Sequence, residues 1–162
     1  MAQYNLLING FIQSSTYSGT GNLELTSSQI NSLYDNDMLS SVINLSTSNI
    51  LYLDIDLFNR VRISDISLYI DTTIDRDTAL DKVDFYYKND PLDSYVSIMS
   101  KAQDSDRFYL TNLPELFSPR YIRIAVSDLE CSLYELKILN RAGGYRAHTG
   151  RSRPRVRRPP RR

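Results

Sequence analysis

Apolar and polar residues alternate from Leu51 onward in the stretch ILYLDIDL, residues 50–57. Successive side chains of an extended chain point to opposite sides, so Tyr52, Asp54 and Asp56 share one face and the aliphatic residues between them share the other. This pattern predicts a strand with one buried face and one solvated face.

The chain beyond residue 57 repeats this alternation. Between Val61 and Ile70 the phase shifts at Ser64 and Asp65, which predicts a bulge or a short bend. Five further runs follow the same rule: Val83–Tyr87, Val96–Ile98, Phe108–Leu110, Ile122–Val126 and Tyr134–Ile138. Segments rich in Asp, Asn, Ser and Pro separate them and predict turns and loops. We therefore expect an all-β fold, an antiparallel β-sandwich of the jelly-roll type, in which only Ser27–Leu33 forms a helical turn.

The N-terminal quarter, residues 13–48, is rich in Ser, Thr and Asn and carries little charge. It also holds apolar anchors such as Leu23, Leu25 and Leu33, which favour order over disorder. We expect a loop-rich segment that wraps a sheet edge and belongs to a single domain spanning residues 1–140.

The charges are distributed unevenly along the 162 residues. All 19 acidic residues precede position 141, together with ten basic ones, so residues 1–140 carry a net charge of −9. Residues 141–162 form an Arg-rich extended tail without any acidic residue. Its basic residues are Arg141, Arg146, Arg151, Arg153, Arg155, Arg157, Arg158, Arg161 and Arg162. Such asymmetry is typical of a tail that has its own binding partner.

Guanidinium groups bind phosphates and carboxylates in a bidentate manner, so the tail could bind nucleic acid or an acidic protein surface. The acidic body would repel a nucleic acid. This repulsion favours docking onto an acidic neighbour, such as another copy of the chain in a homo-oligomer or a different protein of a larger assembly.

Several classes of activity are excluded by composition. Cys131 and His148 are the only residues of their types, and His148 lies in the tail. A disulfide within the chain, a zinc site and a Ser-His-Asp triad in the body are therefore excluded, and we expect no enzymatic activity. The N-terminus lacks the pattern of a signal peptide, and no run of 18 apolar residues occurs. We expect a protein made in the cytosol that does not bind membranes.

Twelve Tyr and no Trp give the chain many amphipathic aromatic residues. Tyr17, Tyr34 and Tyr95, with Tyr86 and Tyr87, could line a site for a sugar or a protein. The alternative, which we favour for most of them, is packing across neighbouring strands.

The order of these segments resembles that of discoidin domains, the coagulation-factor type C, galactose-binding-like jelly rolls. The similarity rests on short blocks: Ser32–Asp37, Ile50–Leu57, Val61–Ile70, Val83–Lys88, Tyr95-Val96-Ser97, Pro119–Ile124 and Tyr134–Ile138. Pro119-Arg120-Tyr121-Ile122-Arg123-Ile124 is the most similar block, matching an Ala-Arg-Tyr-Ile-Arg segment of that family.

The resemblance implies two further expectations. Discoidin-like domains often hold a structural Ca²⁺ through an Asp loop and a closing Glu, which implies Asp35, Asp37 and Glu135 as ligands here. They usually bind sugars or phospholipid head groups at loops on one end of the barrel, so the resemblance is consistent with a glycan partner, but the sequence does not identify the ligand.

Three functions are consistent with these observations. We expect a non-enzymatic structural or adhesion module of a larger assembly, docked by its tail. The assembly we favour is a virion, in which the chain would be a phage capsid decoration, tail or fibre-attachment protein. The first alternative is a lectin-like carbohydrate-binding module, in which the tail is incidental. The second is a nucleic-acid-binding protein that acts through the tail.

Overall fold

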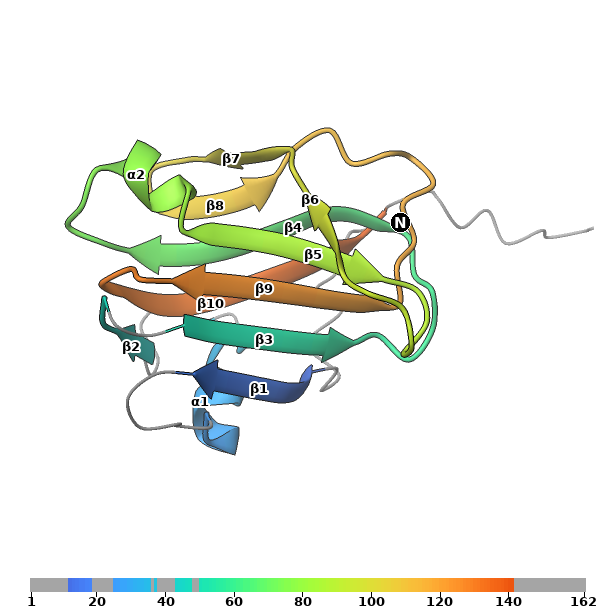
Figure 1. The fold of residues 1–162 in the computed structure, drawn as a ribbon, viewed down its shortest axis with the longest axis horizontal. Coiled ribbons are helices and arrows are strands. Elements are labelled where there is room, and N and C mark those ends of the chain that lie inside the picture. Colours follow the sequence, from blue (N-terminus) through green and yellow to red (C-terminus); the bar gives the residue numbers. More distant parts are fainter. Residues whose placement is uncertain (1–11, 19–24, 36, 38–42, 48–49, 142–162) are drawn as a thin grey trace, which may run out of the picture.

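Two antiparallel sheets pack face to face, as the alternating pattern predicted (Figure 1). The computed structural model describes residues 12–18, 25–35, 37, 43–47 and 50–141. Within them the strands are β1 (Ile12–Ser18), β2 (Ile43–Leu45), β3 (Ile50–Asp56), β4 (Ile63–Asp71), β5 (Val83–Lys88), β6 (Val96–Ile98), β7 (Lys101–Gln103), β8 (Arg107–Leu110), β9 (Tyr121–Ser127) and β10 (Cys131–Asn140).

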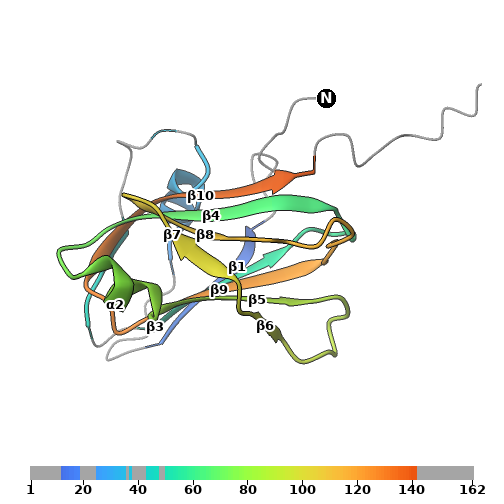
Figure 2. The same cartoon turned by 90° about the horizontal axis from the view of Figure 1, so that it is seen from above.

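The two sheets form separate layers, as seen from above in Figure 2. One sheet, here called the β9 sheet, has the strand order β1-β3-β9-β5-β6. The other, the β10 sheet, has the order β2-β10-β4-β8-β7. The long strand β9 pairs with β3 and β5, and the long strand β10 pairs with β2 and β4. Both therefore join strands that are distant in sequence.

The core lies between the sheets and consists of the faces that alternation assigned to the interior. Leu51, Leu53 and Ile55 of β3 are at most 1% exposed. Phe85 of β5 and Phe108 of β8 are the largest fully buried side chains. Each such side chain contributes about 1.5–3 kcal/mol on burial. The outer faces are thereby left to polar and amphipathic residues.

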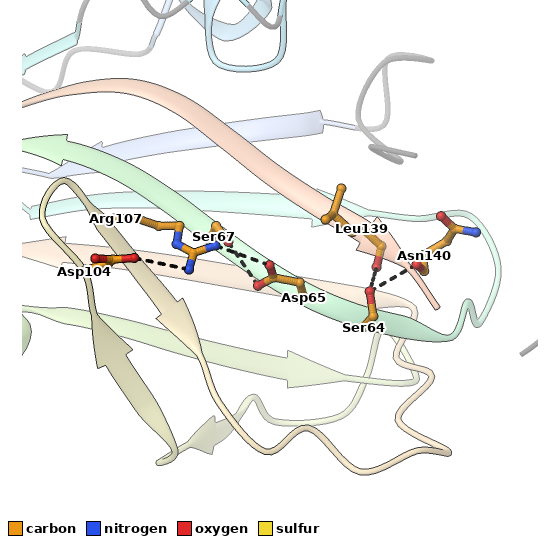
Figure 3. A network of polar contacts seen from close by, with 7 residues as sticks. All are labelled: Ser64, Asp65, Ser67, Asp104, Arg107, Leu139 and Asn140. Carbon is orange, nitrogen blue, oxygen red and sulfur yellow. Dashed lines mark hydrogen bonds and ion pairs between the residues drawn. The ribbon is translucent and has the colours of Figure 1, made fainter. Parts of the chain in front are cut away.

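The predicted bulge is confirmed at Ser64. Asp65 pairs with Leu139 of β10 whereas Ile63 pairs with Asn140, so Ser64 is the extra residue in β4. Its hydroxyl donates to the backbone oxygens of Leu139 (3.4 Å) and Asn140 (3.1 Å), as Figure 3 shows. This contact fixes the register, so that Ile66, Leu68 and Ile70 all reach the core.

Charged groups on the outer side of the β10 sheet form a small network beside this bulge (Figure 3). Ser67 donates to Asp65 at 3.0 Å, and Arg107 lies 3.8 Å from Asp65 and 3.7 Å from Asp104. At these long distances the ion pairs of Arg107 are weak and largely solvated.

Of the two short helices, the local sequence pattern predicted one and missed the other. The helix α1 (Ser27–Ser32) confirms the expected helical turn and begins with a capping box between Thr26 and Gln29. The helix α2 (Arg76–Leu80) corrects the expectation that Ser27–Leu33 would be the one helical turn and that turns and loops alone would separate the later strands. Asp75 caps α2 by accepting from the backbone of Thr78. Neither of these two helices is long and apolar enough to cross a membrane.

The polar N-terminal quarter holds two strands that alternation did not predict. β1 pairs with β3 at one edge of the β9 sheet, and β2 pairs with β10 at one edge of the β10 sheet. The segment was expected to wrap a sheet edge as loops, but its described residues include two strands that form sheet edges themselves. Hydrogen bonds to a neighbouring strand supply the order that the local sequence does not.

Candidate functional site

Antiparallel register brings charged and aromatic side chains into rows on the outer face of the β9 sheet. Asp56 of β3 lies opposite Tyr121 of β9, which lies opposite Lys88 of β5. In the next row Arg123 of β9 lies between Asp54 and Tyr86. Side chains directly opposite each other on one face are in contact distance, so the rows form a continuous polar surface.

Two arginines of this surface form bidentate ion pairs with β3. The Nε and Nη2 atoms of Arg123 donate to the Asp54 carboxylate at 2.6 and 3.1 Å. Arg120 binds Asp56 in the same way at 3.0 and 3.2 Å. The hydrogen bonds with Asp54 raise the pKa of Arg123 above its ordinary value. Both guanidinium groups are thus fixed in orientation.

Asp56 also holds the turn that follows β3. Its Oδ1 atom accepts from the backbone N–H of Phe58 at 2.7 Å, where Phe58 has a positive φ of 65°. A bulky residue in this region is strained and needs such support. Burial acts to raise the pKa of Asp56, but the hydrogen bonds from Arg120 and Phe58 outweigh it and lower that pKa.

Tyr95 lies over this surface from the loop between β5 and β6. Arg123 approaches its ring centroid to 4.3 Å and Lys88 to 4.6 Å, within the range of cation–π contacts. Its hydroxyl donates to Asp54 at the long distance of 3.5 Å. Burial, followed by the charge of Asp54, raises the pKa of Tyr95 to about 12. Tyr95 therefore stays neutral through the physiological range.

These groups line an open pocket of about 250 Å³, here called the Tyr95 pocket. Its lining residues are Asp54, Ile55, Asp56, Lys88, Pro91, Tyr95, Tyr121 and Arg123. It lies where β3 and β5 end and β9 begins. A pocket that combines aromatic surface with a few oriented polar groups is suited to a small polar ligand.

The pocket includes one of the three tyrosines assigned to a ligand loop. Tyr95 lines it, whereas Tyr34 packs partly buried against the core and donates to Asn31 at 2.6 Å. Tyr17 lies on β1 opposite Leu51, and its side chain lies outside the described part of the structure. The structure thus does not place Tyr34 beside Tyr95.

Sequence reasoning missed Lys88, Tyr121 and Arg123 as site residues. Tyr121 and Arg123 occur in the block that most resembles discoidin domains, and both belong to the polar phase of an alternating strand. That phase could have placed them on the outer face. It could not have paired Arg123 with Asp54, because the two are 69 residues apart and meet only through strand register.

The residues implied as calcium ligands lie near the β10 sheet. Asp35 and Asp37 are exposed after α1, and Asp35 accepts from the backbone of Asp37 at 2.9 Å. Glu135 is fully buried in β10, beside the bond from Leu136 N–H to the Leu33 oxygen (2.6 Å). Among the described residues no three His, Cys, Asp or Glu side chains gather closely enough to hold a metal. The donor types suit Ca²⁺ but the described geometry supplies no complete set, so calcium binding stays a prediction.

The Arg-rich tail begins on the body. The backbone N–H of Arg141 donates to the Arg62 oxygen at 3.0 Å, and its Nη2 lies 3.4 Å from the Leu113 oxygen. The other eight arginines, at 146, 151, 153, 155, 157, 158, 161 and 162, lie outside the described residues. Docking through the tail, to protein or to nucleic acid, stays a prediction.

A second pocket of about 330 Å³ lies where β4 ends and β10 begins. Its described lining residues include Asp71, Thr72 and Glu130, and none is aromatic. Cys131 also lines it, and burial raises the pKa of that thiol to about 12. Such a thiol is protonated and inert at neutral pH. The Tyr95 pocket is therefore the better candidate site.

Comparison with known proteins identifies the fold. No protein-family model and no curated protein matches the sequence. Solved structures do match: CpGH89CBM32-6 produced by Clostridium perfringens has a TM-score of 0.60 at 15% identity, covering 85% of this chain and 100% of that one. Chitosan-binding module 1 from a chitosanase/glucanase of Paenibacillus sp. IK-5 has a TM-score of 0.53 at 12% identity, covering 83% and 98%.

A third structure, the fucose-binding module SpX-3 of Streptococcus pneumoniae, has a TM-score of 0.51 at 16% identity, covering 83% of this chain and 96% of that one. At these identities the similarity establishes the fold alone. The predicted architecture is confirmed: the chain has the discoidin-like, galactose-binding-like jelly-roll fold.

Proposed function

We propose that this chain is a non-catalytic carbohydrate-binding module whose ligand occupies the Tyr95 pocket. The observation that carries the proposal is the grouping, in one open pocket, of two tyrosine rings with the oriented donors of Lys88 and Arg123. Sugars present apolar C–H faces and many hydroxyls, so they bind where aromatic rings adjoin fixed hydrogen-bonding groups.

The donors of Arg123 are available as well as fixed. A guanidinium has five N–H donors, and the ion pair with Asp54 uses two of them, leaving about three for a ligand. Because Asp54 holds the group in place, less conformational entropy is lost when a ligand binds.

The solved structures support the same proposal. Two of the similar structures named above are a chitosan-binding and a fucose-binding module, and another is the lectin binding domain of lectinolysin complexed with Lewis b. Within the described residues, the Tyr95 pocket combines aromatic rings with oriented polar groups.

Binding to a glycan array by the wild type and by Tyr95→Ala tests this function. We expect the wild type to bind and Tyr95→Ala to lose about 2- to 10-fold in affinity, because stacking contacts are worth about 0.5–1.5 kcal/mol beyond area burial. Tyr109→Ala is the matched control, since Tyr109 on the β10 sheet has Arg107 at 4.2 Å from its ring. Absence of binding by the wild type, or equal losses in both variants, would contradict the proposal.

The alternative in which the tail carries the function predicts a different result. A version of the chain that ends at Arg141 keeps the contacts of Arg141 with Arg62 and Leu113. We expect it to bind the same glycans as the full chain. Loss of all array binding on this truncation would assign the activity to residues 142–162 instead.

A further inference from the structure

The charged groups of the Tyr95 pocket differ in whether they have a partner of opposite charge. Asp54 and Asp56 are each bound in a bidentate manner by an arginine. Lys88 has no such partner, because among the described residues no carboxylate oxygen lies within 4 Å of its Nζ atom. The pocket therefore contains two neutralised carboxylates and one ammonium whose charge is not balanced by direct contact.

Lys88 is held so that its ammonium stays in the pocket. Its Nζ donates to the Pro91 oxygen at 3.0 Å and lies 4.6 Å from the Tyr95 ring centroid and 5.4 Å from that of Tyr121. The side chain is half-buried. An ammonium has three donors, so about two remain for a ligand after the bond to Pro91.

The hydrogen-bonding groups of the pocket are thus mainly donors. Lys88 and Arg123 together leave about five N–H groups without a protein acceptor among the described residues. Asp54 already accepts three hydrogen bonds, from Arg123 and the Tyr95 hydroxyl, and Asp56 accepts three, from Arg120 and the Phe58 N–H, so about one acceptor site remains on each. A ligand that fits this surface presents acceptors and negative charge.

We infer that the glycan bound in the Tyr95 pocket is acidic, with a carboxylate or sulfate group that contacts Lys88 while the sugar ring lies against Tyr95 and Tyr121. This inference rests on the proposed carbohydrate-binding function and specifies its ligand class. A cationic glycan would be repelled by the Lys88 ammonium, and a neutral glycan would offer that ammonium no opposite charge.

The experiment is array binding of the full chain to matched glycan pairs, each an acidic glycan and its neutral counterpart: a uronate and its methyl ester, a sulfated glycan and its unsulfated parent, a sialylated glycan and its desialylated form. We expect the wild type to prefer the acidic member by about tenfold or more, as for a charge-assisted hydrogen bond. The preferred pair then distinguishes carboxylate from sulfate.

Three lysine variants separate the pocket from the Arg-rich tail. Lys88→Met removes the charge but keeps the stem, and should abolish the preference, while Lys88→Arg should retain it. Lys137→Met is the matched control, since Lys137 lies 5.3 Å from the Tyr69 ring on the β10 sheet. All variants keep both the tail and Arg123, so an acidic preference that persists in Lys88→Met would show that Lys88 does not carry it and would overturn the inference.

Failure of the inference differs from failure of the proposed function. Equal binding to both members of each pair, with Lys88→Met unchanged, would overturn the acidic ligand and leave carbohydrate binding intact. Absence of wild-type binding to every glycan would overturn both.

Discussion

The outer faces of the two sheets carry similar side chains, yet they differ in shape. On the β10 sheet Arg107 lies over Tyr109 and Lys137 over Tyr69, at 4.2 and 5.3 Å. On the β9 sheet Arg123 and Lys88 both approach the single ring of Tyr95. Tyr69, Tyr109 and Lys137 line neither of the two pockets described above.

The difference comes from the loop between β5 and β6. This loop carries Tyr95 and Pro91 over the strand ends, so the cations of the β9 sheet lie inside a pocket and not on an open surface. Contacts between a cation and an aromatic ring are common on sheets and do not by themselves define a site. What marks the Tyr95 pocket is the combination of these contacts with a concave shape and an ammonium that lacks a carboxylate partner.

The largest expected effect is the change in the free energy of unfolding on Ca²⁺ binding, which would concern the β10 sheet and not the β9 sheet. If Asp35, Asp37 and Glu135 take part in a Ca²⁺ site near the β10 sheet, saturating Ca²⁺ should raise the free energy of unfolding by about 2.7 kcal/mol at 100 times Kd. Thermal unfolding with Ca²⁺ and with EDTA measures this. Asp35→Asn should remove the effect and Asp81→Asn should keep it. An unfolding temperature that is indifferent to Ca²⁺ would show that the resemblance does not extend to the metal.

Replacing one arginine on each face gives a sharper comparison. Arg123→Met should weaken glycan binding about tenfold, since it removes charge-assisted donors from the pocket. Arg107→Met should leave binding unchanged. Arg123→Met loses a bidentate pair with a partly buried carboxylate, whereas Arg107→Met loses only long, weak ion pairs, so the free energy of unfolding should fall more in Arg123→Met. Calorimetric titration with the glycan identified on the array measures the difference, and equal affinities in the two variants would remove Arg123 from the site.

The smallest effect concerns two tyrosines, one on each face. Burial raises the pKa of Tyr95 and of Tyr134 to about 12, with Asp54 and Asp106 respectively adding to the shift. Because these values exceed the ordinary value of about 10, each tyrosine stabilises the fold fully below pH 10, and this contribution is lost as the pH rises through 12.

Unfolding of Tyr95→Phe and Tyr134→Phe between pH 9 and 12 measures this contribution. Each variant should lose less stability than the wild type over that range. A wild-type curve that both variants reproduce would show that the phenols ionise equally easily in the folded and unfolded chains.

The sequence predicted those parts of the molecule that depend on local alternation. The outer face of β3, with Tyr52, Asp54 and Asp56, and the bulge at Ser64 both follow from the period of two. The helix α2 was missed because five residues hold too little pattern, although Asp75 is an ordinary N-cap residue. The pairing of β1 with β3 was missed because a polar strand is specified by its neighbour.

The site itself could be predicted only in part. Tyr95 was a candidate because tyrosine suits a ligand surface. Its neighbours Lys88 and Arg123 lie on β5 and β9, which are distant in sequence and adjacent only in the folded sheet. Strand register between distant segments is a tertiary property that no local pattern encodes.

The central claim is that the Tyr95 pocket receives a glycan, and a two-dimensional NMR titration tests it most directly. The ¹⁵N-labelled full chain would be titrated with the highest-affinity glycan from the array, and backbone amide shifts followed by residue. We predict that the largest changes occur at Lys88, Tyr95, Tyr121 and Arg123. Changes centred on Thr72 and Ser132 of the second pocket, or on the arginines beyond residue 141, would contradict the claim.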